Sequence, residues 1–303
     1  QSMRAKTSFK ILVTSQKGGV GKSTISANLA AYLKSQGKSV TLLDFDNHGS
    51  SSSWLTRAPN IGVVIQHKPL PLDQGGNRSL LDARLHLRRA AVSSDVVISD
   101  LTWSNSIAGE LMFEYDLVIV PTSVSEIELA ATVGFLSHHR WVFDSAIHTP
   151  PLLLLSPTRV QPEQMNSDIF SRQRFPVRFI LPPPILEAQS AKNMFERGYL
   201  MDMPDACGHS FVEFGKAVME AQSISEANSR IRQMHKTATT PRRSVLDRPN
   251  SMSNRDLLLA RHRAHQVRKA EPIFAPVPKA EQPKPAIGQF VTRFLNKLAT
   301  GTA

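Results

Sequence analysis

One short stretch of the chain reads Gln16-Lys17-Gly18-Gly19-Val20-Gly21-Lys22-Ser23-Thr24. An apolar run at 9–14 precedes it, and the segment 22–36 that follows has apolar residues at helical spacing. A strand, a glycine-rich turn and Gly-Lys-Ser at the start of a helix form the context that a phosphate-binding loop requires. Glycines let successive backbone N–H groups surround phosphate oxygens, and the helix N-terminus adds partial positive charge. We therefore expect residues 18–24 to bind the phosphates of a nucleotide.

The side chains at the end of this stretch have expected roles of their own. Lys22 should reach the β- and γ-phosphates, and the Ser23 hydroxyl should ligate Mg²⁺. Further along, the apolar run Val96–Ser99 ends in Asp100. An acid at that position suits a Mg²⁺ ion that keeps part of its water shell, so Asp100 is expected to hold the metal through a water. The expected cofactors are ATP and Mg²⁺.

Short runs rich in Val, Ile and Leu recur along the chain with helix-like segments between many of them, and these runs predict strands. Several are apolar at successive positions, which is typical of strands covered on both faces. We predict an α/β fold with a doubly wound, mostly parallel sheet. Gly37 is expected to end the first helix. The predicted strands are Phe9–Thr14, Val40–Phe45, Val63–Gln66, Val96–Ser99, Leu117–Val120, Leu152–Leu155 and Val177–Leu181, and the predicted helices are Lys22–Gln36, Ser125–Ser137 and Glu187–Arg197.

The charge is unevenly distributed along the chain. Residues 228–303 hold 15 Lys and Arg against 4 Asp and Glu, so they carry the whole net charge of +11. They also hold 7 of the 20 prolines and long runs without apolar periodicity, which predicts disorder or order gained on a partner. The expected domains are a nucleotide-binding body at 4–227, a basic flexible tail at 228–285 and an amphipathic helix at 286–299.

The sequence around the loop resembles the ParA/MinD family of deviant Walker-type P-loop ATPases, whose signature is Lys-Gly-Gly-x-Gly-Lys-[Ser/Thr]. The resemblance covers about residues 9–227, and Gln16 before Lys-Gly-Gly is more typical of the ParA branch than of MinD. By this resemblance, Lys17 crosses a dimer interface and touches the partner subunit's nucleotide. A cation supplied in trans stabilises transition-state charge, as an arginine finger does, so ATP binding would be coupled to homodimer formation.

The resemblance also assigns the acids after the second strand. Asp46 matches the switch residue that positions the attacking water and supports Mg²⁺, and Asp44 would lie nearby in a supporting role. Asn47 and His48 replace the family's Pro and Gln, which puts the hydrolysis rate in question more than nucleotide binding. Lys17, Lys22 and Asp46 are the expected catalytic residues, and Ser23, Asp46 and Asp100 the expected metal ligands. A carboxylate is a weak general base, so Asp46 is expected to orient the water more than deprotonate it.

The family implies an ATP hydrolase with slow turnover that a further, stimulating partner accelerates. It would dimerise on ATP–Mg²⁺ and cycle on and off nucleoid DNA, so as to partition plasmid or chromosomal DNA or to position a cargo. Two alternatives stay open, a MinD-like regulator that cycles on a membrane and a nucleotide-gated scaffold with little hydrolysis. Relatives that carry iron–sulfur clusters need more cysteines than Cys207 supplies.

The tail offers two candidate partner surfaces. Spaced cations suit salt-sensitive, sequence-independent contact with DNA phosphates. The last segment has an apolar stripe at helical spacing that suits a membrane surface, a partner's groove or the protein's own body. We expect a bacterial cytoplasmic protein that is nucleoid-associated or peripheral at the inner membrane. The cations are Arg242, Arg243, Arg261, Arg263, Arg268 and Lys269, and the stripe is Ile287, Phe290, Val291, Phe294, Leu295 and Leu298.

Overall fold

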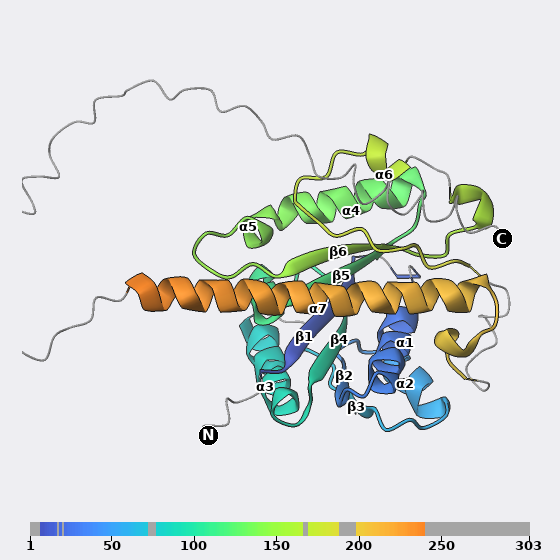
Figure 1. Cartoon of the computed structure of the whole chain (residues 1–303), viewed down its shortest axis with the longest axis horizontal. Helices are drawn as coiled ribbons and strands as arrows, with labels where there is room; N and C mark the ends of the chain where they lie inside the picture. Colours follow the sequence, from blue (N-terminus) through green and yellow to red (C-terminus); the bar gives the residue numbers. More distant parts are fainter. Residues whose placement is uncertain are drawn as a thin grey trace, which may run out of the picture. The chain divides into compact units, whose positions relative to one another are not determined.

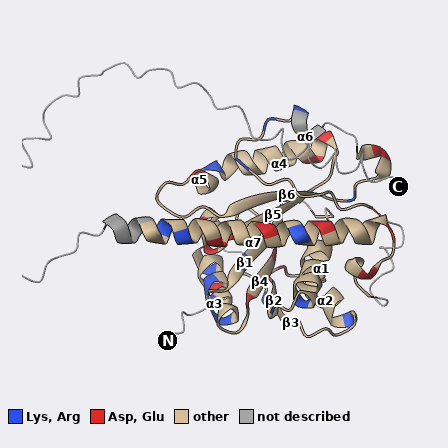
Figure 2. Ribbon diagram, in the orientation of Figure 1, with Lys and Arg blue, Asp and Glu red and all other residues tan. Residues whose placement is uncertain are grey.

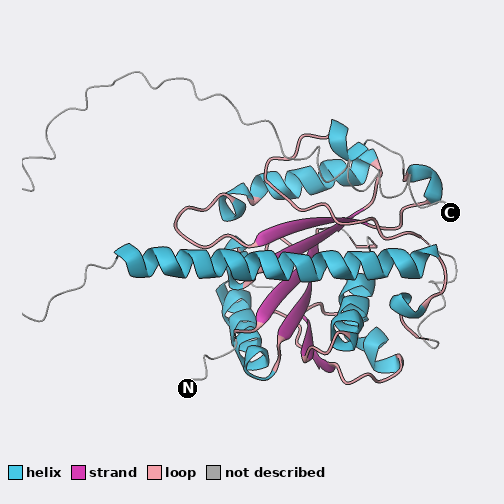
Figure 3. Cartoon of the chain, viewed as in Figure 1, coloured by secondary structure: helices cyan, strands magenta, loops and turns pink. Residues whose placement is uncertain are grey.

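The computed structural model describes residues 7–16, 18–19, 21–71, 77–165, 169–187 and 198–239 (Figure 1). The chain divides into two compact units between Asn228 and Ser229, and the fold below is that of the first. Its centre is a six-stranded parallel sheet in the order β3-β2-β4-β1-β5-β6 (Figure 3). The predicted α/β fold class is confirmed. The strands are β1 Phe9–Ser15, β2 Val40–Asp44, β3 Val64–His67, β4 Val96–Thr102, β5 Leu117–Thr122 and β6 Leu152–Pro157.

Helices cover both faces of the sheet. One face packs against α1, α2 and α7, and the other against α3, η1, α4 and α5. Within β1, Ile11 and Val13 belong to the first core and Leu12 to the second, and all three are fully buried. Burial on both faces is why the strand sequences are continuously apolar. The helices are α1 Lys22–Ser35, α2 Ser50–Arg57, α3 Asn77–Ser93, η1 Gly109–Glu114, α4 Glu126–His138, α5 Arg140–Phe143, η2 Pro162–Gln164, α6 Ile169–Arg172, η4 Leu200–Asp202 and α7 Ala206–Thr239.

Local sequence signals set the ends of two predicted helices. Gly37 has φ +81°, and its N–H donates to the Lys34 carbonyl at 3.0 Å, so a residue without a Cβ ends α1 as predicted. Ser125 begins α4, because its side chain accepts a hydrogen bond from the Glu128 N–H at 3.3 Å. These caps satisfy backbone groups that the helices themselves leave without partners.

Helix α7 packs on the sheet through one stripe of buried residues. Cys207, Phe211, Phe214 and Val218 recur at helical spacing, and all are less than 4% exposed. Acidic and basic side chains both occur elsewhere along the helix (Figure 2). A Cβ on Gly208 would lie 2.0 Å from a backbone carbonyl oxygen of the preceding segment, so the helix can start there only with glycine. The helix continues past residue 228, where the sequence analysis begins the flexible tail, to Thr239.

One predicted strand, Val177–Leu181, is wrong. This segment forms only an isolated bridge between Ile180 and Leu154, in which the Ile180 N–H donates to the Leu153 carbonyl at 2.8 Å. Prolines at 176 and 182–184 remove backbone N–H donors on both sides of this segment. A ladder that extends beyond the single bridge therefore cannot form. Most of the predicted helix Glu187–Arg197, the basic tail beyond Thr239 and the helix at 286–299 lie outside the described residues. Among the described helices, none combines the length and the apolar character needed to cross a bilayer.

Candidate functional site

The glycine-rich loop joins β1 to α1 at the carboxyl edge of the sheet. Gly19 and Gly21 have φ of +82° and +86°, which favours glycine, and Gly21 immediately precedes the first residue of α1. Gly18 has no positive φ, and a Cβ added to it would have no atom within 4 Å. Nothing in the described chain therefore requires glycine at 18, whereas a ligand that approaches the backbone closely would. The expected loop residues Lys17 and Val20 lie outside the described residues.

Lys22 is the centre of the site. Its side chain is only 7% exposed, and Nζ lies 2.5 Å from both Asp46 Oδ2 and Asp100 Oδ1. Burial works against the charged ammonium, but the two carboxylates outweigh burial and raise the pKa of Lys22 above its ordinary value. The structure thus brings together three predicted residues from β1–α1, β2 and β4.

Asp100 is fully buried in β4, two residues before the strand ends at Thr102. Burial raises the pKa of its carboxyl above the ordinary value, and the nearby Lys22 ammonium opposes that rise. Its second oxygen, Oδ2, is buried without a hydrogen-bond partner among the described residues. A buried carboxylate oxygen without a partner is costly unless a water or a cation completes its environment. The donor set therefore fits a hard cation and its water shell.

Asp46 is tied to the strand that carries Asp100. The Thr102 N–H donates to Asp46 Oδ1 at 2.6 Å, and the Thr102 hydroxyl donates to Asp46 Oδ2 at 2.8 Å. The Asp46 carboxylate is therefore fixed by two donors from β4 in addition to Lys22, which leaves it 18% exposed at the edge of the site. The sequence analysis did not identify Thr102. The sequence feature that could have identified Thr102 is its position two residues after Asp100, which puts both side chains on the same face of the strand.

The hydrogen bonds of Asp44 differ from those of Asp46, because they go to α2 and to the turn before it. It is fully buried, and its Oδ2 accepts hydrogen bonds from the Ser51 hydroxyl at 2.9 Å and the Ser52 N–H at 2.8 Å. Its Oδ1 accepts from the Asp46 N–H at 3.2 Å. Asp44 thus anchors the first turn of α2 and the turn that carries Asp46, and it makes no ion pair with Lys22.

His67, at the end of β3, also contacts this turn. Its Nε2 lies 2.8 Å from the Asp46 carbonyl oxygen. A Cβ on Gly49 would lie 2.8 Å from the His67 ring, and Gly49 has φ +58°. The imidazole therefore packs closely on the turn between β2 and α2. The sequence analysis did not identify His67, because nothing local signals a contact across 21 residues.

Two further residues that the sequence predicts to bind the phosphates or the metal, Ser23 and Thr24, lie in the first turn of α1. Ser23 is half-buried and Thr24 is exposed. Neither side chain has a hydrogen-bond partner among the described residues, so both hydroxyls are available to a ligand at the loop.

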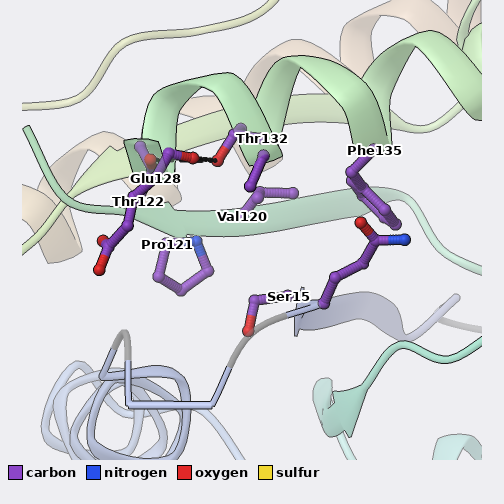
Figure 4. A pocket seen from close by; sticks show the side chains of 9 residues that line it. Ser15, Val120, Pro121, Thr122, Glu128, Thr132 and Phe135 are labelled. Carbon is purple, nitrogen blue, oxygen red and sulfur yellow. Dashed lines mark hydrogen bonds between the residues drawn. The ribbon is translucent and has the colours of Figure 1, made fainter. Parts of the chain in front are cut away.

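A pocket opens beside the loop between β1, β5 and α4 (Figure 4). Gln16 and Ser15 line it from the β1 side, and Pro121 and Glu128 line it from the β5–α4 side. On the β5–α4 side, the Thr132 hydroxyl donates to the Thr122 hydroxyl at 3.1 Å (Figure 4). The pocket is a small, partly open hollow at the carboxyl edge of the sheet, next to the start of the loop.

Comparison with known proteins agrees with this geometry. The family described as CobQ/CobB/MinD/ParA nucleotide binding domain matches residues 11–287. The chromosome-partitioning ATPase Soj of Thermus thermophilus is 46% identical over 70 residues, which cover 22% of this chain and 28% of Soj. The maintenance of carboxysome distribution protein A of Halothiobacillus neapolitanus is 29% identical over 153 residues, which cover 50% of this chain and 65% of that protein.

The iron–sulfur cluster assembly factor NUBP2 of Mus musculus is also similar, at 33% identity over 164 residues, which cover 49% of this chain and 56% of NUBP2. The matched segments span less than two thirds of each of these three relatives.

Two solved structures share the fold. The ATP complex of a variant of Cyanothece McdA has a TM-score of 0.58 and 17% identity, and the match covers 72% of this chain and 97% of that one. Cobyrinic acid a,c-diamide synthase of Mycobacterium smegmatis, with a bound ATP analog and magnesium, has a TM-score of 0.55 and 22% identity, with 70% and 94% covered. With the glycine-rich loop, the Lys22 ion pairs and the family match over residues 11–287, the predicted ParA/MinD relationship is confirmed, and the chain belongs to the CobQ/CobB/MinD/ParA family of nucleotide-binding domains.

Proposed function

We propose that this protein binds ATP with Mg²⁺, hydrolyses it slowly, and uses the nucleotide to control a homodimer that cycles on and off nucleoid DNA. The observation that carries the proposal is the ion-paired Lys22 beside the buried, unpartnered Oδ2 of Asp100. A buried cation between two carboxylates, next to an open glycine loop, is an arrangement suited to exchange one anionic partner for another.

The proposed roles follow from the chemistry of each side chain. Lys22 exchanges its carboxylate partners for phosphate oxygens, and the backbone N–H groups of the loop donate hydrogen bonds to the remaining phosphate oxygens. Ser23 and, through a water, Asp100 hold Mg²⁺, which when bound neutralises phosphate charge. Asp46, kept in place by Thr102, orients the attacking water. Without a stronger base, intrinsic turnover is slow and a stimulating partner sets the rate.

The proposed cycle needs a dimer and a surface. Lys17 reaches the nucleotide of the second copy, so that only the ATP-bound state is a stable dimer. The cations of the tail contact DNA phosphates, and two tails in one dimer bind more tightly than one. Soj is named as a chromosome-partitioning ATPase and the Halothiobacillus protein as one that distributes carboxysomes. These relatives support a role in partitioning DNA or positioning a cargo.

The test is DNA binding of the full chain against nucleotide state. Non-specific duplex DNA is titrated without nucleotide, with ADP and with ATP–Mg²⁺, across a salt series. We expect binding that requires ATP–Mg²⁺, weakens steeply with salt, and is lost in Lys17→Ala and in a variant that replaces six tail cations by alanine. The tail variant replaces Arg242, Arg243, Arg261, Arg263, Arg268 and Lys269.

The matched control removes the same number of exposed cations from the body. It should retain nucleotide-dependent binding, because the proposal assigns the DNA contact to the tail. Absence of binding in every nucleotide state would overturn the DNA surface, and liposomes of anionic lipid would then test the membrane alternative. An ATP-bound dimer that persists for hours with Mg²⁺ would favour the scaffold alternative. The control replaces Lys68, Arg78, Arg88, Arg89, Arg140 and Lys216.

A further inference from the structure

Arg159, just after β6, has an unusual backbone conformation. Its φ is +54°, and among the described residues it is the one non-glycine residue with a positive φ. A residue with a Cβ is disfavoured in this left-handed region, and such outliers persist only where the surrounding structure holds them. The backbone on both sides is held. The Thr158 N–H donates to the Thr122 carbonyl at 2.9 Å, and the Val160 N–H donates to the Ile185 carbonyl at 3.1 Å.

The side chain of Arg159 reaches the phosphate-binding loop. Nη1 donates to the Gly19 carbonyl oxygen at 3.0 Å, a contact between residues 140 positions apart. Nη2 lies 3.6 Å from Glu187 Oε1, and the side chains of Arg159 and Glu187 are 59% and 26% exposed. The Glu187 N–H donates to the Val160 carbonyl at 2.9 Å, which keeps the two charged residues on adjacent segments.

The carbonyl side of the loop matters for what the loop can bind. In a loop whose N–H groups converge on an anion, the carbonyls turn away from that anion. A donor that holds the Gly19 carbonyl restrains the rotation of the loop backbone at Gly19. An exposed ion pair contributes little by itself, so the pair with Glu187 does not explain why the disfavoured backbone is kept. The hydrogen bond to the Gly19 carbonyl is the contact that this backbone conformation of Arg159 makes possible.

We infer that Arg159 is a positioning residue of the phosphate-binding loop. Its guanidinium holds the Gly19 carbonyl and keeps the loop in the conformation that receives a triphosphate before the nucleotide arrives. A loop ordered in advance does not lose that conformational freedom on binding, so the anchor raises nucleotide affinity. The inference rests on the proposed nucleotide binding and adds a residue that the glycine-loop pattern does not contain.

Four variants of the full chain test the inference: Arg159→Ala, Arg159→Gly, Arg159→Lys and Glu187→Gln. For each, the Kd of a fluorescent ATP analogue with Mg²⁺ and the KM and kcat of ATP hydrolysis are measured, together with the Tm without nucleotide. Arg159→Ala should raise Kd and KM about tenfold, the equivalent of one hydrogen bond to a charged donor. Because the anchor acts on binding, kcat should change by less than about twofold.

The glycine and lysine variants separate positioning from general stability. Arg159→Gly removes the anchor but also the Cβ that disfavours φ +54°, so affinity should fall as in Arg159→Ala while Tm stays the same or rises. Arg159→Lys keeps one donor within reach of the same carbonyl and should restore Kd to within about threefold of wild type. Glu187→Gln should stay within a similar range, since it leaves the Gly19 contact in place.

Two results would overturn the inference while nucleotide binding itself stands. In the first, the wild-type protein binds the ATP analogue, and the Kd values of Arg159→Ala and Arg159→Gly stay within about twofold of the wild-type value. The other is an affinity that falls only in proportion to Tm and is restored, with Tm, by glycine. A wild-type protein that binds no nucleotide would instead overturn the proposed function, and the inference with it.

Discussion

Asp44 and Asp46 are two residues apart, yet the structure predicts different consequences when each is changed. Asp44 is fully buried and accepts three hydrogen bonds, from the Ser51 hydroxyl, the Ser52 N–H and the Asp46 N–H. Asp44→Ala leaves a hydroxyl and two backbone N–H groups in the protein interior without an acceptor. With about 1 to 1.5 kcal/mol for each and partial relief by water, the free energy of unfolding should fall by about 3 kcal/mol. That is a large part of the stability of an ordinary domain.

Asp46→Asn is the matched control. The Asp46 side chain is partly exposed and an amide can still accept from the Thr102 N–H, but the change removes one of the two carboxylate partners of Lys22 and leaves Asp100 as the other. The free energy of unfolding should therefore fall by about 1 to 2 kcal/mol, less than in Asp44→Ala. Both variants are unfolded with urea without nucleotide, and their ATP hydrolysis is measured under folding conditions. Asp46→Asn should lose hydrolysis with the smaller loss of stability, and Asp44→Ala should show the larger loss of stability. A loss below about 1 kcal/mol in Asp44→Ala, or equal losses in the two variants, would refute the assignment of Asp44 to α2 and the adjacent turn.

Three further predictions follow from other parts of the structure. Gly208→Ala should lower the free energy of unfolding by more than about 3 kcal/mol, because the added Cβ would lie 2.0 Å from a backbone carbonyl oxygen. In contrast, Gly134→Ala in α4 should raise the free energy of unfolding by about 0.5 to 1 kcal/mol, because no atom lies within 4 Å of the added Cβ. Burial raises the pKa of Cys207 to about 11, so at pH 8 roughly one thiol in a thousand is ionised, and a disulfide reagent should label the native protein slowly and the urea-unfolded protein fast; equal rates would contradict this. Thr102→Val removes one of the two donors that Thr102 offers to the Asp46 carboxylate and should lower kcat for ATP hydrolysis about tenfold with little change in nucleotide Kd. An unchanged kcat would rule out the proposed role of Thr102.

The sequence predicts the site to the extent that chain order and parallel strands determine it. Lys22, Asp46 and Asp100 each follow an apolar run, and parallel strands deliver their carboxyl ends to one edge, so their proximity follows from the pattern. Arg159 could not be found in this way, because its contact with Gly19 depends on how two loops approach across 140 positions.

The false strand at Val177–Leu181 has the opposite cause. The apolar residues of this segment do pack against the protein interior, and Ile180, for example, is half-buried against the first core. A strand also needs a run of N–H donors, and the flanking prolines interrupt that run. Apolar patterning alone therefore predicts where a segment is buried better than it predicts whether the segment pairs.

The place of β1 in the sheet has a consequence for biosynthesis. β1 is made before both of the strands with which it pairs among the described residues: β4, where Phe9 lies opposite Val96, and β5, where Ile11 lies opposite Leu117. While the chain grows, this apolar strand has no partner until about a hundred further residues have left the ribosome, the interval in which chaperones act on exposed strands. The glycine loop is thus synthesised well before Asp100 and becomes a site only when Asp100 joins it.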